Sequence, residues 1–115
     1  MKLIQIGMSK SGNFWFYQIL QHILKANHIA YKSFIQSHPI HPIAKEWKLS
    51  FQEQADIDLM TIEPKHVYWR ISHIVRMPIH DLDDHVSKVS HVWAHSFHCE
   101  KTREVLSKFD KIIYI

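Results

Sequence analysis

The sequence contains little glycine, little cysteine and no long apolar segment. Its 115 residues include two glycines, Gly7 and Gly12, and one cysteine, Cys99. A single cysteine cannot form a disulfide within the chain, which favours a reducing compartment. No apolar segment reaches the roughly 18 residues that a membrane helix needs, and "SKSG" breaks the apolar N-terminal segment too early for a secretory signal. We therefore expect a cytoplasmic protein without a membrane span, or the cytoplasm-facing part of a larger one.

A strong excess of one charge is also missing. The chain has 14 Lys and Arg residues against 11 Asp and Glu residues, a formal charge of +3. The basic residues are scattered and nowhere consecutive, so the sequence does not predict binding to a nucleic acid. A small anionic ligand needs only a local positive site, and the composition is compatible with one.

The length and composition are those of one globular domain. Hydrophobic residues make up 46% of the chain and charged residues 22%, which is ordinary for a soluble protein. The sequence ends on "KIIYI", an apolar and β-branched run typical of a buried strand. Because a polar turn normally follows such a strand, we expect residues 1–115 to be the N-terminal part of a single larger domain.

Apolar periodicity predicts how strands and helices alternate. Strands are expected at 2–6, 88–95 and 111–115, with extended structure over 66–77. Helices are expected from Asn13 to about Ala26, over 43–59 and over 99–109, where the Glu104–Lys108 spacing supports the helix. The proline-containing segment 37–42 is expected to be irregular, and 78–85 a polar connector. Strand–helix–strand repeats of this kind predict an α/β fold with right-handed crossovers and a parallel sheet flanked by helices.

Both glycines lie in "GMSKSG", the loop between the first strand and the first helix. Gly7 lets the chain leave the strand sharply, and Gly12 lets a phosphate approach the backbone without a Cβ in the way. The first N–H groups of the helix and its dipole attract anions, while Lys10 adds a charge and Ser11 a hydroxyl donor. The loop is not a Walker A motif, because Lys10 precedes the second glycine. The sequence predicts a phosphate-binding loop here; a tight turn with a solvated lysine is the alternative.

The segment "KSGNFW" resembles the Lys-Ser-Gly-Thr-Thr-Trp signature of the sulfotransferases that use 3′-phosphoadenosine 5′-phosphosulfate (PAPS). Near the other end, "WAHSFH", the helix after it and "KIIYI" resemble the family's catalytic histidine, the following helix and the strand that leads into the 3′-phosphate motif. That alignment places His95 at the catalytic histidine. Asn13 and Phe14 stand where the family has two threonines, Trp93 where it often has lysine, and the family's Arg-Asp-Pro-Arg-Asp segment would begin only after Ile115.

The resemblance implies a P-loop-NTPase-like sheet, incomplete at the C-terminus, and direct transfer of a sulfuryl group from PAPS to an acceptor hydroxyl or amine. His95 would remove the acceptor's proton, and Lys10 would stabilise the departing 5′-phosphate. The nucleotide would be bound by Lys10, Ser11, Gly12, Asn13, Phe14 and Trp15, with the tryptophan against the adenine. The acceptor would be a small molecule, a glycan or a lipid, and no metal is required. The alternative is a nucleotide- or phosphate-binding module without sulfotransfer activity.

Several other residues allow two interpretations. His91, His95 and His98 suggest a metal site by their spacing, but no carboxylate or second cysteine completes the ligand set. Trp47 and Trp69 could line an acceptor pocket, although core packing is favoured. Arg70 and Arg76 could bind an anionic acceptor or face water. Cys99 is expected to be a buried, inert thiol, although a helix start could lower its pKa. Four other histidines are expected at the surface: His22, His28, His38 and His41.

Overall fold

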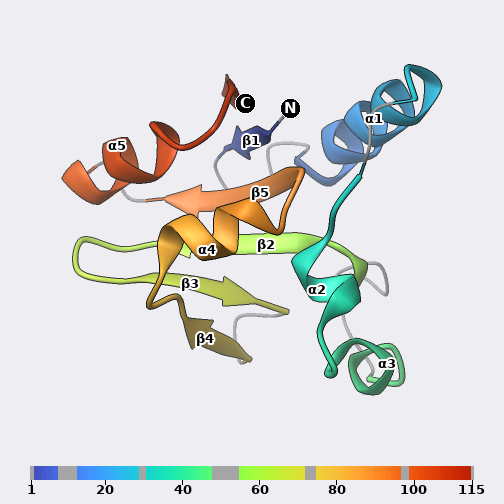
Figure 1. Cartoon of the computed structure of the whole chain (residues 1–115), viewed down its shortest axis with the longest axis horizontal. Coiled ribbons are helices and arrows are strands. Elements are labelled where there is room, and N and C mark those ends of the chain that lie inside the picture. The colour runs from blue at the N-terminus through green and yellow to red at the C-terminus, as the bar shows by residue number, and fades with distance from the viewer. Residues whose placement is uncertain are drawn as a thin grey trace.

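The chain folds into one mixed β-sheet with helices on both faces, as the computed structural model in Figure 1 shows. The structure describes residues 2–7, 13–28, 31–47, 55–71, 75–96 and 99–114. Its strands are β1 (Leu3–Ile6), β2 (Asp58–Ile62), β3 (Val67–Arg70), β4 (Arg76–Pro78), β5 (His91–Ser96) and β6 (Lys111–Tyr114). Its helices are α1 (Asn13–Ala26), α2 (Phe34–Ser37), α3 (His41–Ala44), α4 (Leu82–Ser87) and α5 (Glu100–Leu106).

The sheet has the strand order β4-β3-β2-β5-β1-β6. Four neighbouring strands, β2, β5, β1 and β6, are parallel, as the alternation of strands and helices predicts. β3 and β4 extend the sheet in antiparallel orientation, so the expectation of a purely parallel sheet is wrong at this edge. The reason is the short turn after β2, where the backbone N–H of Glu63 donates to the carbonyl oxygen of His66 at 2.9 Å. A turn this short can only reverse the chain into a hairpin.

The two faces of the sheet pack against different helices. Alternate side chains of a strand point to opposite faces. On one face, Val92 and Ala94 of β5 belong to the main core, to which α4 contributes Val86 and α5 contributes Val105. On the other face, Trp93 packs against a smaller cluster in which Tyr17 of α1 meets Ile57 and Leu59. Helices on both faces of a mostly parallel sheet define the α/β architecture.

Several predicted elements are confirmed. β1 accounts for the strand at 2–6, and α1 has the bounds that the periodicity predicts, Asn13–Ala26. α5 lies within 99–109, and β5 overlaps the strand predicted at 88–95. The extended segment 66–77 contains the two strands β3 and β4 instead of one. Lys108 pairs with Asp83 and Glu104 with Lys101, so the Glu104–Lys108 spacing that supports the helix does not produce an ion pair between these two residues.

The helix predicted over 43–59 is wrong. α3 ends at Ala44, Ile43 is 57% exposed, and β2 begins at Asp58. β2 is buried on both of its faces, so its apolar residues do not alternate with polar ones and its period cannot be read. The other expected irregular region, 37–42, includes the first residues of α3.

The polar connector expected at 78–85 contains the start of α4. Asp81 caps this helix by accepting a hydrogen bond from the backbone N–H of Asp84 at 3.0 Å. Asp83 and Asp84 lie in the first turn, where acidic side chains interact favourably with the helix dipole. A capping aspartate followed by acidic residues indicates the start of a helix, although the same polar composition is also typical of a connector.

The C-terminal strand is not buried as predicted. β6 pairs with β1 on one side and lies at the edge of the described sheet. Ile112 and Tyr114 are 40% and 71% exposed. Burial here depends on what lies beside the strand, which its composition does not specify.

Candidate functional site

Gly7 and His95 lie side by side near the carboxyl ends of β1 and β5. β1 and β5 are parallel neighbours, and Ile6 lies in register with Ala94. The next residues are Gly7, which directly follows β1, and His95, the penultimate residue of β5, and their backbones lie one strand spacing of about 4.8 Å apart. The glycine loop and the predicted catalytic histidine, 88 residues apart in sequence numbering (95 − 7), therefore start from the same point at the carboxyl edge of the sheet.

This point is where the chain changes direction across the sheet. The connection that leaves β1 leads to β2, beyond β5, whereas the connection that leaves β5 leads to β6, beyond β1. Two adjacent strands thus send their connections in opposite directions. In open α/β sheets, ligands bind in the crevice that such a reversal opens at the carboxyl ends of the strands. The strand order places such a reversal between β1 and β5.

His95 is partly buried at the end of β5, on the face that carries Trp93. Its ring centroid lies 5.9 Å from that of Trp93, and the tryptophan ring in turn lies 6.2 Å from Tyr17 of α1. Burial lowers the pKa of His95, and the positive charge of Arg70 lowers it further. At neutral pH the imidazole is therefore uncharged and able to accept a proton.

The phosphate-binding loop lies largely outside the described part of the chain. Lys10, Ser11 and Gly12 fall there, as do the side chains of Asn13 and Phe14 at the start of α1. Trp15 is described, and 67% of its surface is exposed. It does not belong to the core of the described residues, so its large aromatic surface faces outward from the first turn of α1.

The sequence does not identify one neighbour of His95, Thr61, and leaves two roles possible for another, Arg70. Thr61 of β2 lies in register with His95, and the sequence does not single it out, because no strand was predicted over 58–62. Arg70, at the end of β3, lies on the same face and acts electrostatically on His95. Sequence patterns identify Arg70 as a possible anion ligand, but they do not reveal that the sheet brings it near position 95.

The histidines are distributed differently from the metal-site pattern. His91 and His95 share a face of β5, as expected for a strand, but about 13 Å of strand separates residues four positions apart. His91 is fully buried, stacks on Tyr17 and receives a hydrogen bond from Gln21. His98 lies outside the described residues. Within the described ranges, no three histidine, cysteine, aspartate or glutamate side chains gather as a metal site would need.

Other surface expectations need correction. His22 and His28 are exposed as expected, but His38 and His41 are partly buried. The His38 ring packs 5.1 Å from that of Trp69, and His41 Nε2 lies 2.7 Å from an oxygen of Asp56. These contacts arise because the segment folds back over the sheet, instead of forming an open proline loop.

Trp47 and Trp69 have the structural role that the sequence favoured. Both pack against a small cluster of buried residues, formed by Ile35, Ala44, Ala55 and Ile71. The tryptophans thus cover the buried residues around α2 and α3. This arrangement favours the core interpretation over the acceptor pocket.

Cys99 is neither buried nor an ordinary thiol. It is partly exposed and precedes α5 as the N-cap residue. The Thr102 hydroxyl, 3.4 Å from the sulfur, is the main cause that lowers its pKa. The expectation of a buried cysteine is therefore wrong.

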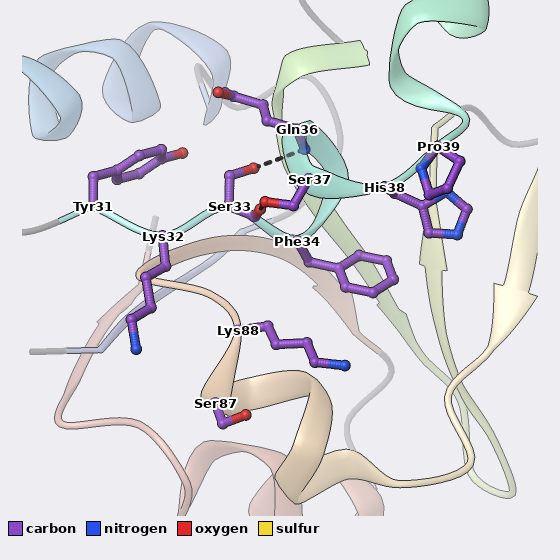
Figure 2. A pocket seen from close by; sticks show the side chains of 10 residues that line it. All are labelled: Tyr31, Lys32, Ser33, Phe34, Gln36, Ser37, His38, Pro39, Ser87 and Lys88. Carbon is purple, nitrogen blue, oxygen red and sulfur yellow. Dashed lines mark hydrogen bonds between the residues drawn. The ribbon is translucent and has the colours of Figure 1, made fainter.

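A pocket of about 700 Å³ lies at the opposite edge of the sheet, between α2 and the end of α4 (Figure 2). Ser90, which directly precedes β5, ties this region down by accepting a hydrogen bond from the backbone N–H of Lys32 at 2.7 Å. The hydroxyls of the pocket already serve the fold: Ser33 accepts from the Gln36 N–H, as the dashed line in Figure 2 shows, and Ser87 donates to the Asp84 carbonyl. The ammonium group of Lys88 pairs with Asp84 at 2.9 Å. The pocket thus offers few groups without an internal partner.

Comparisons with models of known protein families, with curated proteins and with solved structures find no significant match to this chain. Among the described residues, no helix has the length and apolar character that crossing a bilayer requires.

Proposed function

We propose that this chain carries the donor site and the general base of a PAPS-dependent sulfotransferase with a P-loop-like sheet. One observation supports the proposal above all: Gly7, just after β1, and His95, near the end of β5, are neighbours on adjacent parallel strands whose connections run in opposite directions. The loop that resembles the family's 5′-phosphate motif and the histidine that resembles its base thus lie beside the same reversal of the sheet connections. Nothing in the local sequence requires this, because the two segments could equally have lain at distant strands.

In the proposed reaction, His95 and the glycine loop act on opposite ends of the transfer. The acceptor oxygen or nitrogen attacks the sulfur of PAPS, the bond from sulfur to the bridging oxygen breaks, and the 5′-phosphate leaves with the electron pair. His95, neutral because burial and Arg70 lower its pKa, takes the acceptor's proton. Lys10 stabilises the charge that grows on the leaving phosphate, and the backbone N–H groups from Ser11 to Asn13 bind that phosphate. Transfer then depends on positioning and charge stabilisation, as in phosphoryl transfer.

Trp15 fits the role of the adenine contact. An indole with 67% of its surface exposed, in the first turn of the helix that follows the loop, is available to stack on a purine. The acceptor would approach the open face beside His95.

The test is transfer of labelled sulfate from PAPS to a panel of phenols, sugars, lipids and amines. Lys10→Ala and His95→Ala are each expected to reduce transfer by at least about 100-fold, the usual loss when an electrostatic group or a general base is removed. Lys25→Ala and His22→Ala, at exposed positions of α1, are matched controls that should retain activity. Circular dichroism of all four variants checks that they fold.

The alternative function gives a different result. A nucleotide- or phosphate-binding module would bind adenosine 3′,5′-bisphosphate or ATP through the loop and transfer nothing. Equal affinity for ATP and PAPS, with no transfer to any acceptor in the panel, would exclude the sulfotransferase proposal. Binding that depends on Lys10 but not on His95 would support the module.

A further inference from the structure

Arg70 and Arg76 lie directly opposite each other on neighbouring strands but have different surroundings. The two residues are in register on β3 and β4. Arg76 is exposed, pairs with Glu63 at 3.0 Å, and its guanidinium lies 4.2 Å above the ring of Tyr68. Arg70 is partly buried, and within the described ranges no carboxylate or carbonyl oxygen accepts a hydrogen bond from it. One guanidinium is thus satisfied by the fold and the other is not.

The position of Arg70 is unfavourable without an anion. Burial lowers the pKa of Arg70, which reflects the cost of removing its charge from water. Arg76, directly opposite on β4, has its charge paired with Glu63, so burial is the cost that remains at Arg70. A carboxylate, sulfate or phosphate group would offset this cost, since guanidinium binds these groups through two parallel hydrogen bonds.

The sheet places Arg70 beside the candidate site. Leu59 of β2 lies in register with both Trp93 and Arg70, and Thr61 with both His95 and Tyr68. Arg70 is therefore two strands across from His95 and two residues along, about 12 Å between Cα atoms on the same face. The length of an arginine side chain covers much of that distance, in agreement with the electrostatic effect of Arg70 on His95.

We propose that Arg70 binds an anionic group of the acceptor molecule and so orients its hydroxyl or amine toward His95. The inference rests on the proposed function, and it specifies the acceptor class as one that carries a carboxylate, sulfate or phosphate. The anion lies on the side of His95 toward β3, away from the glycine loop beside β1. An acceptor that bridges Arg70 and His95 therefore spans β2, and Thr61 lies beneath it.

The test measures binding without turnover, so that it stands apart from the transfer assay. A panel of phenolic carboxylates, each with its neutral methyl ester, is titrated into the protein, and binding is followed by the NMR signal of the His95 imidazole. The wild type is expected to bind carboxylates about tenfold more tightly than the esters, the value of one charge-assisted hydrogen bond. Arg70→Gln should abolish this preference, Arg70→Lys should retain part of it, and Arg76→Gln, the matched control, should leave it intact.

A second measurement in the same samples tests the proximity of the two side chains. Arg70→Gln removes a positive charge near His95, so the pKa of the imidazole should rise, whereas Arg76→Gln should change it less. This shift does not require any ligand. Circular dichroism checks separately that the variant is folded, because unfolding would also raise the pKa of His95 toward its ordinary value.

Three results would overturn the inference. The first is a wild type that binds esters as well as carboxylates across the panel. The second is an Arg70→Gln variant that keeps the preference. The third is a variant that loses affinity for adenosine 3′,5′-bisphosphate instead, which would assign Arg70 to the donor. A protein that prefers carboxylates but transfers no sulfate would refute the proposed sulfotransfer and leave the anion site standing.

Discussion

The imidazole of His91 stacks on the phenol ring of Tyr17, with centroids 4.0 Å apart and an angle of 15° between the planes. The stack joins the first strand residue of β5 to the second turn of α1. Gln21 completes the contact, because its amide nitrogen lies 2.8 Å from His91 Nδ1 and donates to it. The neutral imidazole then carries its proton on Nε2, which is buried without a partner among the described residues. α1 is thus held to the sheet on which Trp93 and His95 lie.

Replacing Gln21 with leucine should lower the free energy of unfolding by about 1–3 kcal/mol, because a buried ring nitrogen loses its only donor. Urea unfolding monitored by circular dichroism measures this change. Gln18→Leu, at an exposed position of the same helix, should change the free energy of unfolding by less than about 0.5 kcal/mol. Equal effects of the two substitutions would show that the hydrogen bond contributes little.

Acidification should unfold the protein through two buried histidines. Burial lowers the pKa of His91 to about 3, and burial together with the charge of Lys88 lowers that of His85 to about 4. Both have a pKa near 6.5 in the unfolded chain, so the unfolded state binds more protons below that pH. The stability they contribute is complete above about pH 6.5 and is lost progressively as the pH falls toward the folded-state values.

The urea midpoint, measured from about pH 7 to pH 4, tests this dependence. His85→Phe, which keeps a ring against Phe34, should show a shallower dependence on pH, while His22→Gln at an exposed position should follow the wild type. An unchanged slope in His85→Phe would contradict the assignment.

Asp58 should act in the opposite direction. Its carboxyl group is buried and accepts a hydrogen bond from the backbone N–H of Ile35 at 2.9 Å; burial, only partly offset by such bonds, raises its pKa to about 7. The folded protein therefore keeps this proton while the unfolded chain loses it near pH 3.8, and stability falls as the pH rises from there to about 7. Asp58→Asn cannot ionise, so it should match the wild type near pH 4 and exceed its stability by at least about 1 kcal/mol at pH 8.

Asp56→Asn is the matched control, because this nearby carboxylate has the reverse environment. Partial burial opposes ionisation of Asp56, but His41 at 2.7 Å and Lys45 at 2.6 Å outweigh it and lower its pKa. Its removal should reduce stability above pH 4, by less than about 1 kcal/mol since the pair is partly exposed. If both variants shifted stability in the same direction at pH 8, the predicted ionisation of Asp58 would be wrong.

Trp15→Ala separates stability from nucleotide binding. Because the indole is 67% exposed, its removal should change the free energy of unfolding by less than about 0.5 kcal/mol. Under the proposed function it should weaken binding of adenosine 3′,5′-bisphosphate about tenfold, the value of one base–aromatic stack. Calorimetric titration measures the affinity, and Ile23→Ala, also exposed on α1, is the control. Equal affinities of all three proteins would remove Trp15 from the site.

Those parts of the fold that depend on neighbouring residues were predictable. α1 has the predicted bounds because apolar residues recur at helical spacing from Asn13 to Ala26 without a glycine or proline to interrupt them. β2 was missed because a strand buried on both faces shows no alternation. α4 was missed because its acidic first turn, Asp83 and Asp84, has the composition of a loop.

The candidate site also has parts that the sequence predicts and parts that it does not. The glycine loop and His95 belong to local motifs, so their residues alone identified them. Arg70 and Thr61 enter the site only through the register of three strands, which no local pattern specifies. Which side chains are buried also depends on the tertiary structure. His91 and the carboxyl group of Asp58 are buried although both are polar. Ile112 and Tyr114 are exposed although both have large apolar side chains.

By itself, the sequence determined where the chain turns from strand to helix at Gly7, the extent of α1 and α5, and the α/β character of the fold. These properties arise from backbone freedom and apolar spacing within a few residues, which the sequence records directly. Only the tertiary structure decided that β1 and β5 are neighbours, that Arg70 faces His95, and which charged groups lose contact with water. Those outcomes depend on which distant segments pair in the sheet, and pairing is determined by the packing of the whole core rather than by any one segment.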